Sequence, residues 1–252
     1  LEPKSTIVYI ESPGNPLLEI TDIALVSAFA KANTLTTAID NTFASPINQT
    51  HADFGIDIVL PSAAKYLGEQ NDICAGTVSC SQEHIERVWK TAKNYGGSLS
   101  DQTVWLLERS IKTLALRVKR QSKNAKKIAA SLEKNPNIKK VNYPGLKSHP
   151  QHQLAKKQMN AYGGMMSFEL KNHIDQTAFL ERLEVIFPAL SLAGVESTIL
   201  APAATSHSLL SLKEREKQGI SDGLLRFSVG IEEPSILIAD LENAMEKSRR
   251  KK

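Results

Sequence analysis

Lys65 is the residue whose surroundings point most directly to chemistry. It follows a short apolar run, Ile58-Val-Leu60, and the small residues Ser62-Ala-Ala64. The apolar run is typical of the end of a buried strand. Because only small side chains precede the lysine, its amine could reach into a cleft and form a Schiff base with a carbonyl group. A lysine after a strand is more commonly a solvated loop residue, so position alone leaves both interpretations open.

An aspartate occupies a comparable position upstream. Asp40 follows a second strand-like run, Leu35-Thr-Thr-Ala-Ile39, and begins the turn Asp40-Asn-Thr-Phe-Ala-Ser-Pro46. A lysine and a carboxylate at neighbouring strand ends are the pair that pyridoxal phosphate requires, since the lysine binds the aldehyde and the acid pairs with the pyridinium nitrogen. Aspartate also begins turns for conformational reasons alone. The pair therefore indicates a cofactor site without excluding a simple turn.

The elements that must position these residues are typical of an open α/β sheet. The spacing predicts strands over residues 7–11, 35–39 and 56–60, and a helix after the first strand that Thr21 or Asp22 caps. Ligands of such sheets bind at the carboxyl ends of the strands. Four polar residues are expected there: Asn15, Asp40, Ser62 and Lys65.

A long helix is predicted in the middle of the chain. Apolar residues recur at helical spacing over residues 101–134, with Trp105 on the apolar face, and Asn135-Pro-Asn137 ends the pattern. Upstream we expect a strand over 76–80 and a helix that Ser81 caps and that runs through Trp89. A helix as long as the first commonly links two domains, so we place a domain boundary near residue 136.

Two domains follow from this boundary. Residues 1–136 are predicted to form part of a large cofactor-binding α/β domain plus the linking helix, and residues 137–252 a C-terminal α+β domain. The strands expected in the C-terminal part lie over 138–142, 164–170, 188–192 and 224–230, and the helices over 151–160, 175–186 and 234–247.

Composition argues against several other classes of protein. The 252 residues are 41% hydrophobic and 23% charged, and much of the net charge of +4 lies in the tail 247–252, so nucleic-acid binding is not predicted. No apolar run is long enough to span a membrane, and no signal peptide opens the chain. Cys74 and Cys80 have neither redox nor zinc spacing, which favours idle thiols in a reducing cytoplasm. His149 and His152 are expected in a surface loop rather than at a metal.

Five ordered motifs carry a resemblance that covers the chain from about Ile7 to Met245. They closely resemble the Cys/Met-metabolism family of pyridoxal-phosphate enzymes, which includes cystathionine lyases, cystathionine γ-synthase, methionine γ-lyase and O-acetylhomoserine sulfhydrylase. The motifs are Glu11-Ser-Pro-Gly-Asn-Pro16, Asp40-Asn-Thr-Phe-Ala-Ser-Pro46, Ser62-Ala-Ala-Lys65-Tyr-Leu-Gly68, Ser191-Leu-Ala-Gly-Val-Glu-Ser197 and Leu225-Arg226-Phe-Ser-Val-Gly-Ile-Glu232.

The resemblance implies the fold and the class of reaction. The implied fold is α/β, of the pyridoxal-phosphate-dependent transferase type (aspartate aminotransferase fold type I), with a mostly parallel sheet and a smaller α+β C-terminal domain. The implied reaction is transsulfuration, in which the C–S bond of cystathionine or a related sulfur amino acid is cleaved by α,β- or α,γ-elimination. The alternative is γ-replacement, as in cystathionine γ-synthase or O-acetylhomoserine sulfhydrylase. The resemblance also implies a cytoplasmic homotetramer, built as a dimer of dimers, and a chain that lacks the family's first third.

Matching motif positions imply the cofactor-binding residues for pyridoxal 5'-phosphate. Lys65 is implied as the catalytic Schiff-base lysine and proton shuttle, and Asp40 as the acid that keeps the pyridine nitrogen protonated. Ser62 is implied to donate to the cofactor phosphate, and Asn15 to the phenolic oxygen of the ring. Alone, Ser62 and Asn15 are equally typical of caps or turns.

The substrate-binding residues follow in the same way. Arg226 is implied to bind the α-carboxylate of the sulfur amino acid, because a guanidinium offers a planar bidentate fork. Ser197 is implied to line the same pocket and Asn15 to help orient the substrate. Alone, Ser197 is also typical of a cap or turn residue.

The chain departs from the family pattern at several positions. Ala64 stands where the family commonly has threonine, and Glu69-Gln70 where it often has Gly-His. Ala193 replaces a glycine, and Ala201 stands where a histidine often precedes Pro-Ala. These departures keep a second hypothesis open, a non-catalytic relative that acts as a binding or regulatory subunit. The stretch 95–100 and Trp105 are expected either to pack against a neighbouring subunit or to face the chain's own core.

Overall fold

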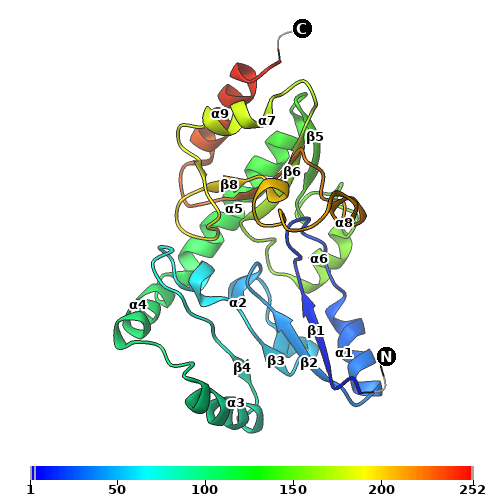
Figure 1. The fold of residues 1–252 in the computed structure, drawn as a ribbon, viewed down its shortest axis with the longest axis vertical. Coiled ribbons are helices and arrows are strands. Elements are labelled where there is room, and N and C mark those ends of the chain that lie inside the picture. Colours follow the sequence, from blue (N-terminus) through cyan, green and yellow to red (C-terminus); the bar gives the residue numbers. More distant parts are fainter. Residues whose placement is uncertain (1, 3, 251–252) are drawn as a thin grey trace.

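The computed structural model describes residue 2 and residues 4–250. It contains two sheets, a four-stranded sheet of order β1-β2-β3-β4 and a five-stranded sheet of order β5-β6-β9-β8-β7. Figure 1 shows the two sheets in different halves of an elongated molecule, with the long helix α5 (Leu114–Lys134) running along the second sheet.

The first sheet consists of three parallel strands and one antiparallel edge strand. β1 (Ile7–Glu11), β2 (Thr36–Asp40) and β3 (Ile58–Val59) are parallel, and β4 (Ser79–Cys80) pairs antiparallel with β3. α1 (Ile23–Ala32) connects β1 to β2, and the Asp22 side chain caps it by accepting a hydrogen bond from Leu25 N at 3.0 Å. The predicted alternation of strands and helix is confirmed, although the third and fourth strands are two residues long rather than five.

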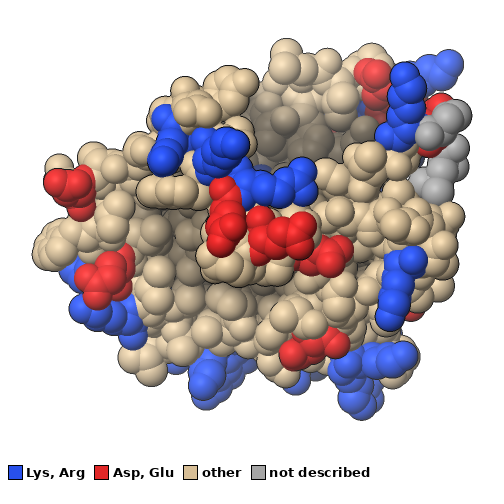
Figure 2. Space-filling view, turned by 90° about the horizontal axis from the view of Figure 1, so that it is seen from below, with Lys and Arg blue, Asp and Glu red and all other residues tan. Residues whose placement is uncertain are grey.

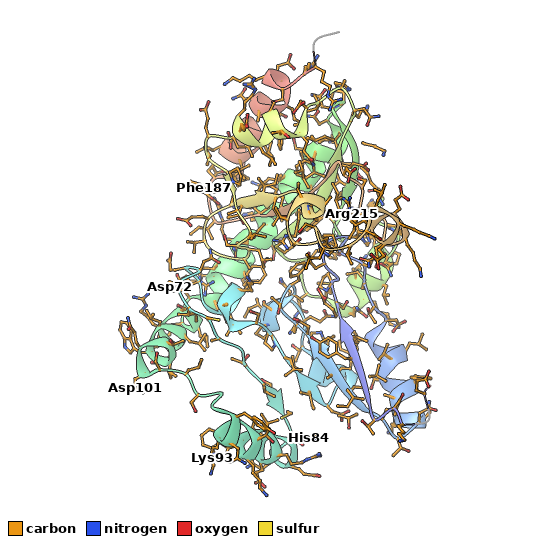
Figure 3. All side chains as sticks on the ribbon, in the orientation of Figure 1. Asp72, His84, Lys93, Asp101, Phe187 and Arg215 are labelled. Atoms are coloured by element: carbon orange, nitrogen blue, oxygen red, sulfur yellow. The ribbon has the colours of Figure 1, made fainter. Side chains whose placement is uncertain are left out.

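Small helical elements follow the strand ends. α2 (Ser45–Asn48) and a 3₁₀ turn over His51–Phe54 lie between β2 and β3. α3 (Gln82–Tyr95) is capped by Ser81 as predicted, but it continues past Trp89 until Gly96, whose φ of 76° ends the helix. Figure 3 shows the α3 side chains, among them His84 and Lys93, apart from the main body.

The prediction of one continuous helix over residues 101–134 is wrong. The chain forms α4 (Asp101–Ile111) and α5 (Leu114–Lys134), with a break at Lys112–Thr113. Trp105 lies on α4 and is 57% exposed, so it does not face the chain's own core. α5 carries a long row of buried residues and packs against β5, β6 and α9. It also packs against the helical segments 45–48 and 63–67 that follow the strands of the first sheet, so it joins the two halves.

The second sheet is mainly antiparallel. β5 (Ile138–Asn142), β6 (Met165–Leu170), β9 (Leu224–Ser228) and β8 (Thr198–Leu200) pair antiparallel in that order, and β7 (Phe187–Pro188) pairs parallel with β8. The helices of this half are α6 (His152–Gln158), α7 (Gln176–Glu181), α8 (Leu212–Lys217) and α9 (Pro234–Lys247). β8 and α8 were not predicted, and α7 and β7 are shorter than expected.

The main core of this half lies between the sheet, α5 and α9. Its fully buried members include Ile128 of α5, Phe168 of β6, Phe227 of β9 and Leu241 of α9. A second cluster contains Tyr66 together with Val118 and Met165, so residues from both sides of position 136 share it. The division into 1–136 and 137–252 stays a prediction.

The surface of the described residues carries charges of both signs. Figure 2 shows one face on which lysine and arginine side chains are interspersed with aspartate and glutamate. None of the described helices is both long enough and apolar enough to cross a membrane.

The prediction that His149 is a surface residue is wrong, because its side chain is buried and its Nδ1 accepts a hydrogen bond from Gln151 N at 3.2 Å. The Cys74 and Cys80 thiols are free.

Candidate functional site

The carboxyl ends of the three parallel strands meet at one edge of the first sheet. Glu11 and Asp40, the last residues of β1 and β2, are register partners. Asp40 Oδ1 accepts a hydrogen bond from Thr42 N at 2.8 Å, and Thr42 Oγ1 accepts one from Ser62 N at 2.8 Å. Thr42 therefore ties the predicted pyridine-nitrogen acid to the segment that leads to Lys65.

The segment 63–67 forms one irregular helical turn. Its geometry is interrupted at Lys65, whose backbone leaves the helical conformation with φ −107° and ψ −129°. Ala63 N and Ala64 N both donate to the carbonyl of Ala75, at 2.9 and 3.2 Å. Ala63 and Tyr66 on either side are buried. The lysine is thus held between two fixed neighbours.

Lys65 is half-buried, and its surroundings favour the neutral amine. Burial is the largest cause that lowers its pKa, and the positive charge of Arg226 lowers it further. The Cys74 thiol acts in the opposite direction. Because Arg226 lies on β9, this charge acts on Lys65 from the second sheet.

Arg226 is a buried cation. Its side chain is 4% exposed, and burial lowers its pKa to about 10. The guanidinium donates to Asn15 Oδ1 at 3.4 Å and to the carbonyl of Leu190 at 3.0 Å. Within the described part of the chain, no carboxylate lies within salt-bridge distance of it. Burying a guanidinium without a counter-ion costs free energy, and a bound anion that pairs with it would remove that cost.

Ser197 is fully buried and its hydroxyl is already engaged. Ser197 Oγ donates to Glu232 Oε2 at 2.9 Å and accepts from Gly230 N at 2.9 Å, while its backbone N–H donates to Glu232 Oε1 at 2.6 Å. These bonds hold the loop before β8 against the turn after β9. Its role in substrate binding stays a prediction, and the structure adds Glu232 as the residue that fixes it.

Sequence reasoning missed three residues that shape the site: Thr42, Arg117 and Glu232. Thr42 and Glu232 lie inside quoted motifs, but no role was assigned to them. Arg117 was detectable, because it lies three residues after Leu114 and beside Val118 on a helix face that is otherwise apolar. An arginine in that position is expected to have buried partners.

Two departures from the family pattern lie at special backbone positions. Glu69 and Ala193, each where the family commonly has glycine, have φ of 68° and 64°. L-residues with side chains rarely adopt this left-handed region, and each costs about 1–2 kcal/mol there. The two positions are also close in space, because Val195 N donates to the Glu69 carbonyl at 3.1 Å. The family glycine is therefore explained by backbone conformation at both positions.

Comparison with known proteins identifies relatives of the chain. The family described as Cys/Met metabolism PLP-dependent enzyme matches residues 1–246. A cystathionine β-lyase of Lactococcus lactis is 47% identical over 241 residues, which are 95% of this chain and 63% of that protein. A cystathionine γ-lyase of Bacillus subtilis is 42% identical over 98% of this chain and 65% of its own length. The chain thus spans about two thirds or less of the curated relatives it matches.

Solved structures show the same relationship. The cystathionine γ-lyase of Lactobacillus plantarum, complexed with L-serine, has a TM-score of 0.94 and 42% identity over 98% of this chain and 65% of that one. The cystathionine γ-synthase of Xanthomonas oryzae, in complex with cystathionine, has a TM-score of 0.93 and 39% identity over 96% and 63%. The predicted pyridoxal-phosphate-dependent transferase-like fold is confirmed. With the motifs, the fold and the family match in agreement, the chain belongs to the Cys/Met metabolism PLP-dependent enzyme family.

Proposed function

We propose that this chain carries the lysine, the acid and the carboxylate-binding arginine of a pyridoxal-phosphate-dependent enzyme. The proposed reaction is cleavage of the C–S bond of cystathionine or a related sulfur amino acid. The observation that carries the proposal is Arg226, a buried cation without a carboxylate partner among the described residues, whose charge acts on the half-buried amine of Lys65. An α-amino acid brings the missing carboxylate and places its amino group near that amine.

The residues present fit pyridoxal phosphate. Asp40 uses Oδ1 for the Thr42 amide, and its Oδ2 stays available for the pyridinium nitrogen. Ser62 lies at the same strand edge and is proposed to contact the phosphate, and Asn15 the phenolic oxygen. The bound cofactor would supply the aldehyde and an electron sink for the charge that develops at the substrate Cα.

The protein's own groups then bind the substrate and move its proton. Arg226 is expected to bind the α-carboxylate through two parallel hydrogen bonds, in an orientation set by Asn15 and the Leu190 carbonyl. The lowered pKa of Lys65 favours the neutral amine that removal of the α-proton requires. Asp40 would stabilise positive charge on the ring nitrogen of the bound cofactor. No metal is needed for these steps.

The bond that breaks decides the products. α,β-Elimination of cystathionine with water gives homocysteine, pyruvate and ammonia, whereas α,γ-elimination gives cysteine, 2-oxobutyrate and ammonia. The relatives carry the names of both lyases. The second candidate is γ-replacement, supported by the similarity to a cystathionine γ-synthase of Nicotiana tabacum, which is 40% identical over 97% of this chain and 46% of that protein. A non-catalytic role, suggested by Ala64, Glu69 and Gln70, is the third.

Assembly also belongs to this proposal. Large exposed apolar side chains on and beside α3 and α4 support association with other subunits, since exposed apolar patches drive it. These side chains are Trp89, Tyr95, Leu99, Val104 and Trp105. A homotetramer built as a dimer of dimers and a cytoplasmic location are proposed from the resemblance to the family. Light scattering that shows a monodisperse monomer would contradict the assembly.

Cofactor binding is tested by trapping. The protein is mixed with pyridoxal phosphate, reduced with borohydride and digested, and the peptide that contains Lys65 is examined by mass spectrometry for the cofactor adduct. We expect the adduct on Lys65 and its loss in Lys65→Ala, with Lys171→Ala as the matched control. An adduct spread evenly over exposed lysines would overturn the cofactor proposal.

Product analysis tests the reaction. Separate incubations with cystathionine, with methionine, and with an activated homoserine ester plus cysteine, followed by identification of the products, distinguish the three candidates. Pyruvate or 2-oxobutyrate from cystathionine supports a lyase. A new thioether from the homoserine ester and cysteine supports the synthase, and absence of turnover with retained cofactor supports the non-catalytic relative.

A further inference from the structure

Arg117 is the most completely bonded buried cation near the lysine segment. Its side chain is 5% exposed in the first turn of α5. Nη1 donates to the carbonyl of Tyr66 at 2.7 Å, Nη2 to the carbonyl of Ser110 at 2.8 Å, and Nε to Thr113 Oγ1 at 2.9 Å. The guanidinium thus joins the Lys65 segment, the end of α4 and the break before α5.

Glu69 supplies the counter-charge. Its Oε1 lies 3.5 Å from Arg117 Nε, with the two side chains 18% and 5% exposed. Removing one partner of a buried ion pair leaves an uncompensated charge. Glu69 has a left-handed backbone, with φ of 68°, and it is one of the departures from the family pattern noted in the sequence, where glycine is often found.

Tyr66, the residue after Lys65, is fixed at both ends. Its carbonyl accepts the hydrogen bond from Arg117, and its fully buried hydroxyl accepts one from Gly164 N at 3.1 Å. Tyr66 is bonded directly to Lys65, whose own backbone is not helical. A shift of Tyr66 would carry the Lys65 Cα and its side chain with it, and the hydrogen bond from Arg117 to the Tyr66 carbonyl opposes such a shift.

We propose that Arg117 is a positioning residue for Lys65: it holds the Tyr66 carbonyl, with Glu69 as its counter-charge, and so fixes the direction in which the Lys65 amine leaves the 63–67 turn. Arg117 acts through Tyr66, because all of its hydrogen bonds go to Tyr66, Ser110 and Thr113. The consequence for catalysis rests on the proposed function, whereas the positioning itself does not.

The test measures the Lys65 amine directly, without cofactor. The purified chain is acylated with acetic anhydride at several pH values, and the modification of the Lys65 peptide is quantified by mass spectrometry. The pH midpoint of reactivity reports the surroundings of the amine, because burial lowers its pKa most, Arg226 lowers it further and Cys74 raises it. Four variants are compared with the wild type: Arg117→Met, Arg117→Lys, Glu69→Gln and Lys119→Met, the last being an exposed cation on the same helix.

Release of the Tyr66 carbonyl is expected to let the amine reach solvent. In Arg117→Met the midpoint should rise by about one pH unit, which slows acylation roughly tenfold below the midpoint. Arg117→Lys keeps the charge but not the fork, and should give a smaller rise in the same direction. Glu69→Gln should lower the melting temperature while leaving the midpoint near that of the wild type. In Lys119→Met both the melting temperature and the midpoint should be unchanged.

Three results would overturn the inference. One is an unchanged midpoint in a folded Arg117→Met. Another, if that variant does not fold, is an unchanged midpoint in Arg117→Lys. The third is an equal shift in Glu69→Gln, which would indicate general loosening. Failure of the proposed function is separate: the wild type would then not form the pyridoxal phosphate adduct on Lys65, whatever the acylation midpoints show.

Discussion

Glu11 and Asp40 are register partners at the ends of two parallel strands, so two carboxyl groups lie side by side at the predicted ring-nitrogen position. Partial desolvation is the largest cause that raises the pKa of Glu11, followed by the charge of Asp40, and a hydrogen bond from the Asn15 backbone lowers it. The site therefore disfavours the ionised form of Glu11.

Glu11→Gln is expected to stabilise the chain at neutral pH. A carboxyl group whose pKa is raised on folding contributes stability below its ordinary pKa and loses it as pH rises through the folded value. The variant should melt at a higher temperature than the wild type at pH 7.5, and the difference should disappear below about pH 4. Thermal unfolding at both pH values measures this. A variant that melts lower than the wild type at pH 7.5 would contradict it.

Protonation of His51 is expected to destabilise the chain in acid. Its side chain is 2% exposed, both ring nitrogens lack a hydrogen-bond partner among the described residues, and burial lowers its pKa to about 4. Because the folded pKa is lowered, the stabilising contribution is complete above the ordinary value of about 6.5 and disappears as pH falls through about 4. The loss amounts to about 3 kcal/mol. Urea unfolding between pH 7 and 4.5 should show it, with a shallower dependence in His51→Leu.

The two positions where the family has glycine should respond differently to its restoration. In Ala193→Gly, relief of the left-handed strain is offset by the lost methyl contact and the freer unfolded chain, so the free energy of unfolding should change by less than about 1 kcal/mol. Glu69→Gly relieves the same strain but removes the counter-charge of Arg117, and should destabilise by about 2 kcal/mol. Equal effects of the two substitutions in urea unfolding would show that the ion pair contributes nothing.

Arg226→Met should separate stability from ligand binding. Removing a buried cation without a carboxylate partner is expected to stabilise the chain by about 1 kcal/mol or more. The same change removes the proposed carboxylate fork. If an α-amino acid such as L-serine raises the melting temperature of the wild type, as the proposed function predicts, that increase should be lost in the variant. Arg226→Lys, which keeps the charge without the fork, should retain part of that increase. A ligand response in Arg226→Met equal to that of the wild type would exclude this role.

Local patterns were sufficient for some elements and not for others. The apolar runs and turn residues around β1 and β2 and the Asp22 cap of α1 act within a few residues, and these elements were predicted. The break between α4 and α5 was not, because Ile111 and Leu114 continue the helical spacing across it. At the break, the side chains of Thr113 and Arg117 donate hydrogen bonds to the Ser110 carbonyl. Such side-chain hydrogen bonds do not change the spacing of apolar residues, so the sequence pattern does not reveal the break. β8, three fully buried residues long, is too short to show alternation.

The same distinction holds for the candidate site. Lys65, Asp40 and Arg226 were predicted from residue type and motif position, and the structure brings the surroundings of all three to one region between the sheets. Arg117 and Glu69 were not assigned roles, because their function depends on a carbonyl that follows Lys65 and on a helix more than forty residues away. Long-range polar partners of this kind become visible only when the chain is folded.

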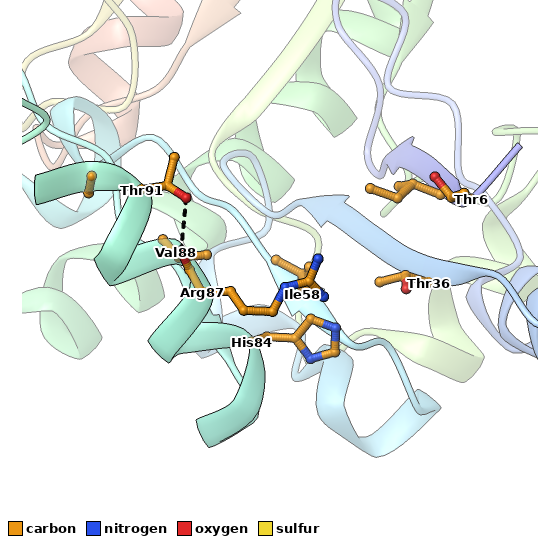
Figure 4. A pocket seen from close by; sticks show the side chains of 9 residues that line it. Thr6, Thr36, Ile58, His84, Arg87, Val88 and Thr91 are labelled. Carbon is orange, nitrogen blue, oxygen red and sulfur yellow. Dashed lines mark hydrogen bonds between the residues drawn. The ribbon is translucent and has the colours of Figure 1, made fainter. Parts of the chain in front are cut away.

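The cleft beside α3 bears on how the chain unfolds. α3 has no buried residue and packs against β4. A cleft of about 620 Å³ separates it from β1, β2 and β3. On the sheet side the cleft is lined by Thr6, Thr36 and Ile58, and on the α3 side by His84, Arg87 and Val88 (Figure 4). A helix of fourteen residues is marginal in water without tertiary packing. Its amide hydrogens should therefore exchange nearly as fast as those of a free peptide, while those in the buried turns of α5 exchange only on global unfolding. In such a molecule a single melting temperature reports the α5 half and leaves the opening of α3 unseen.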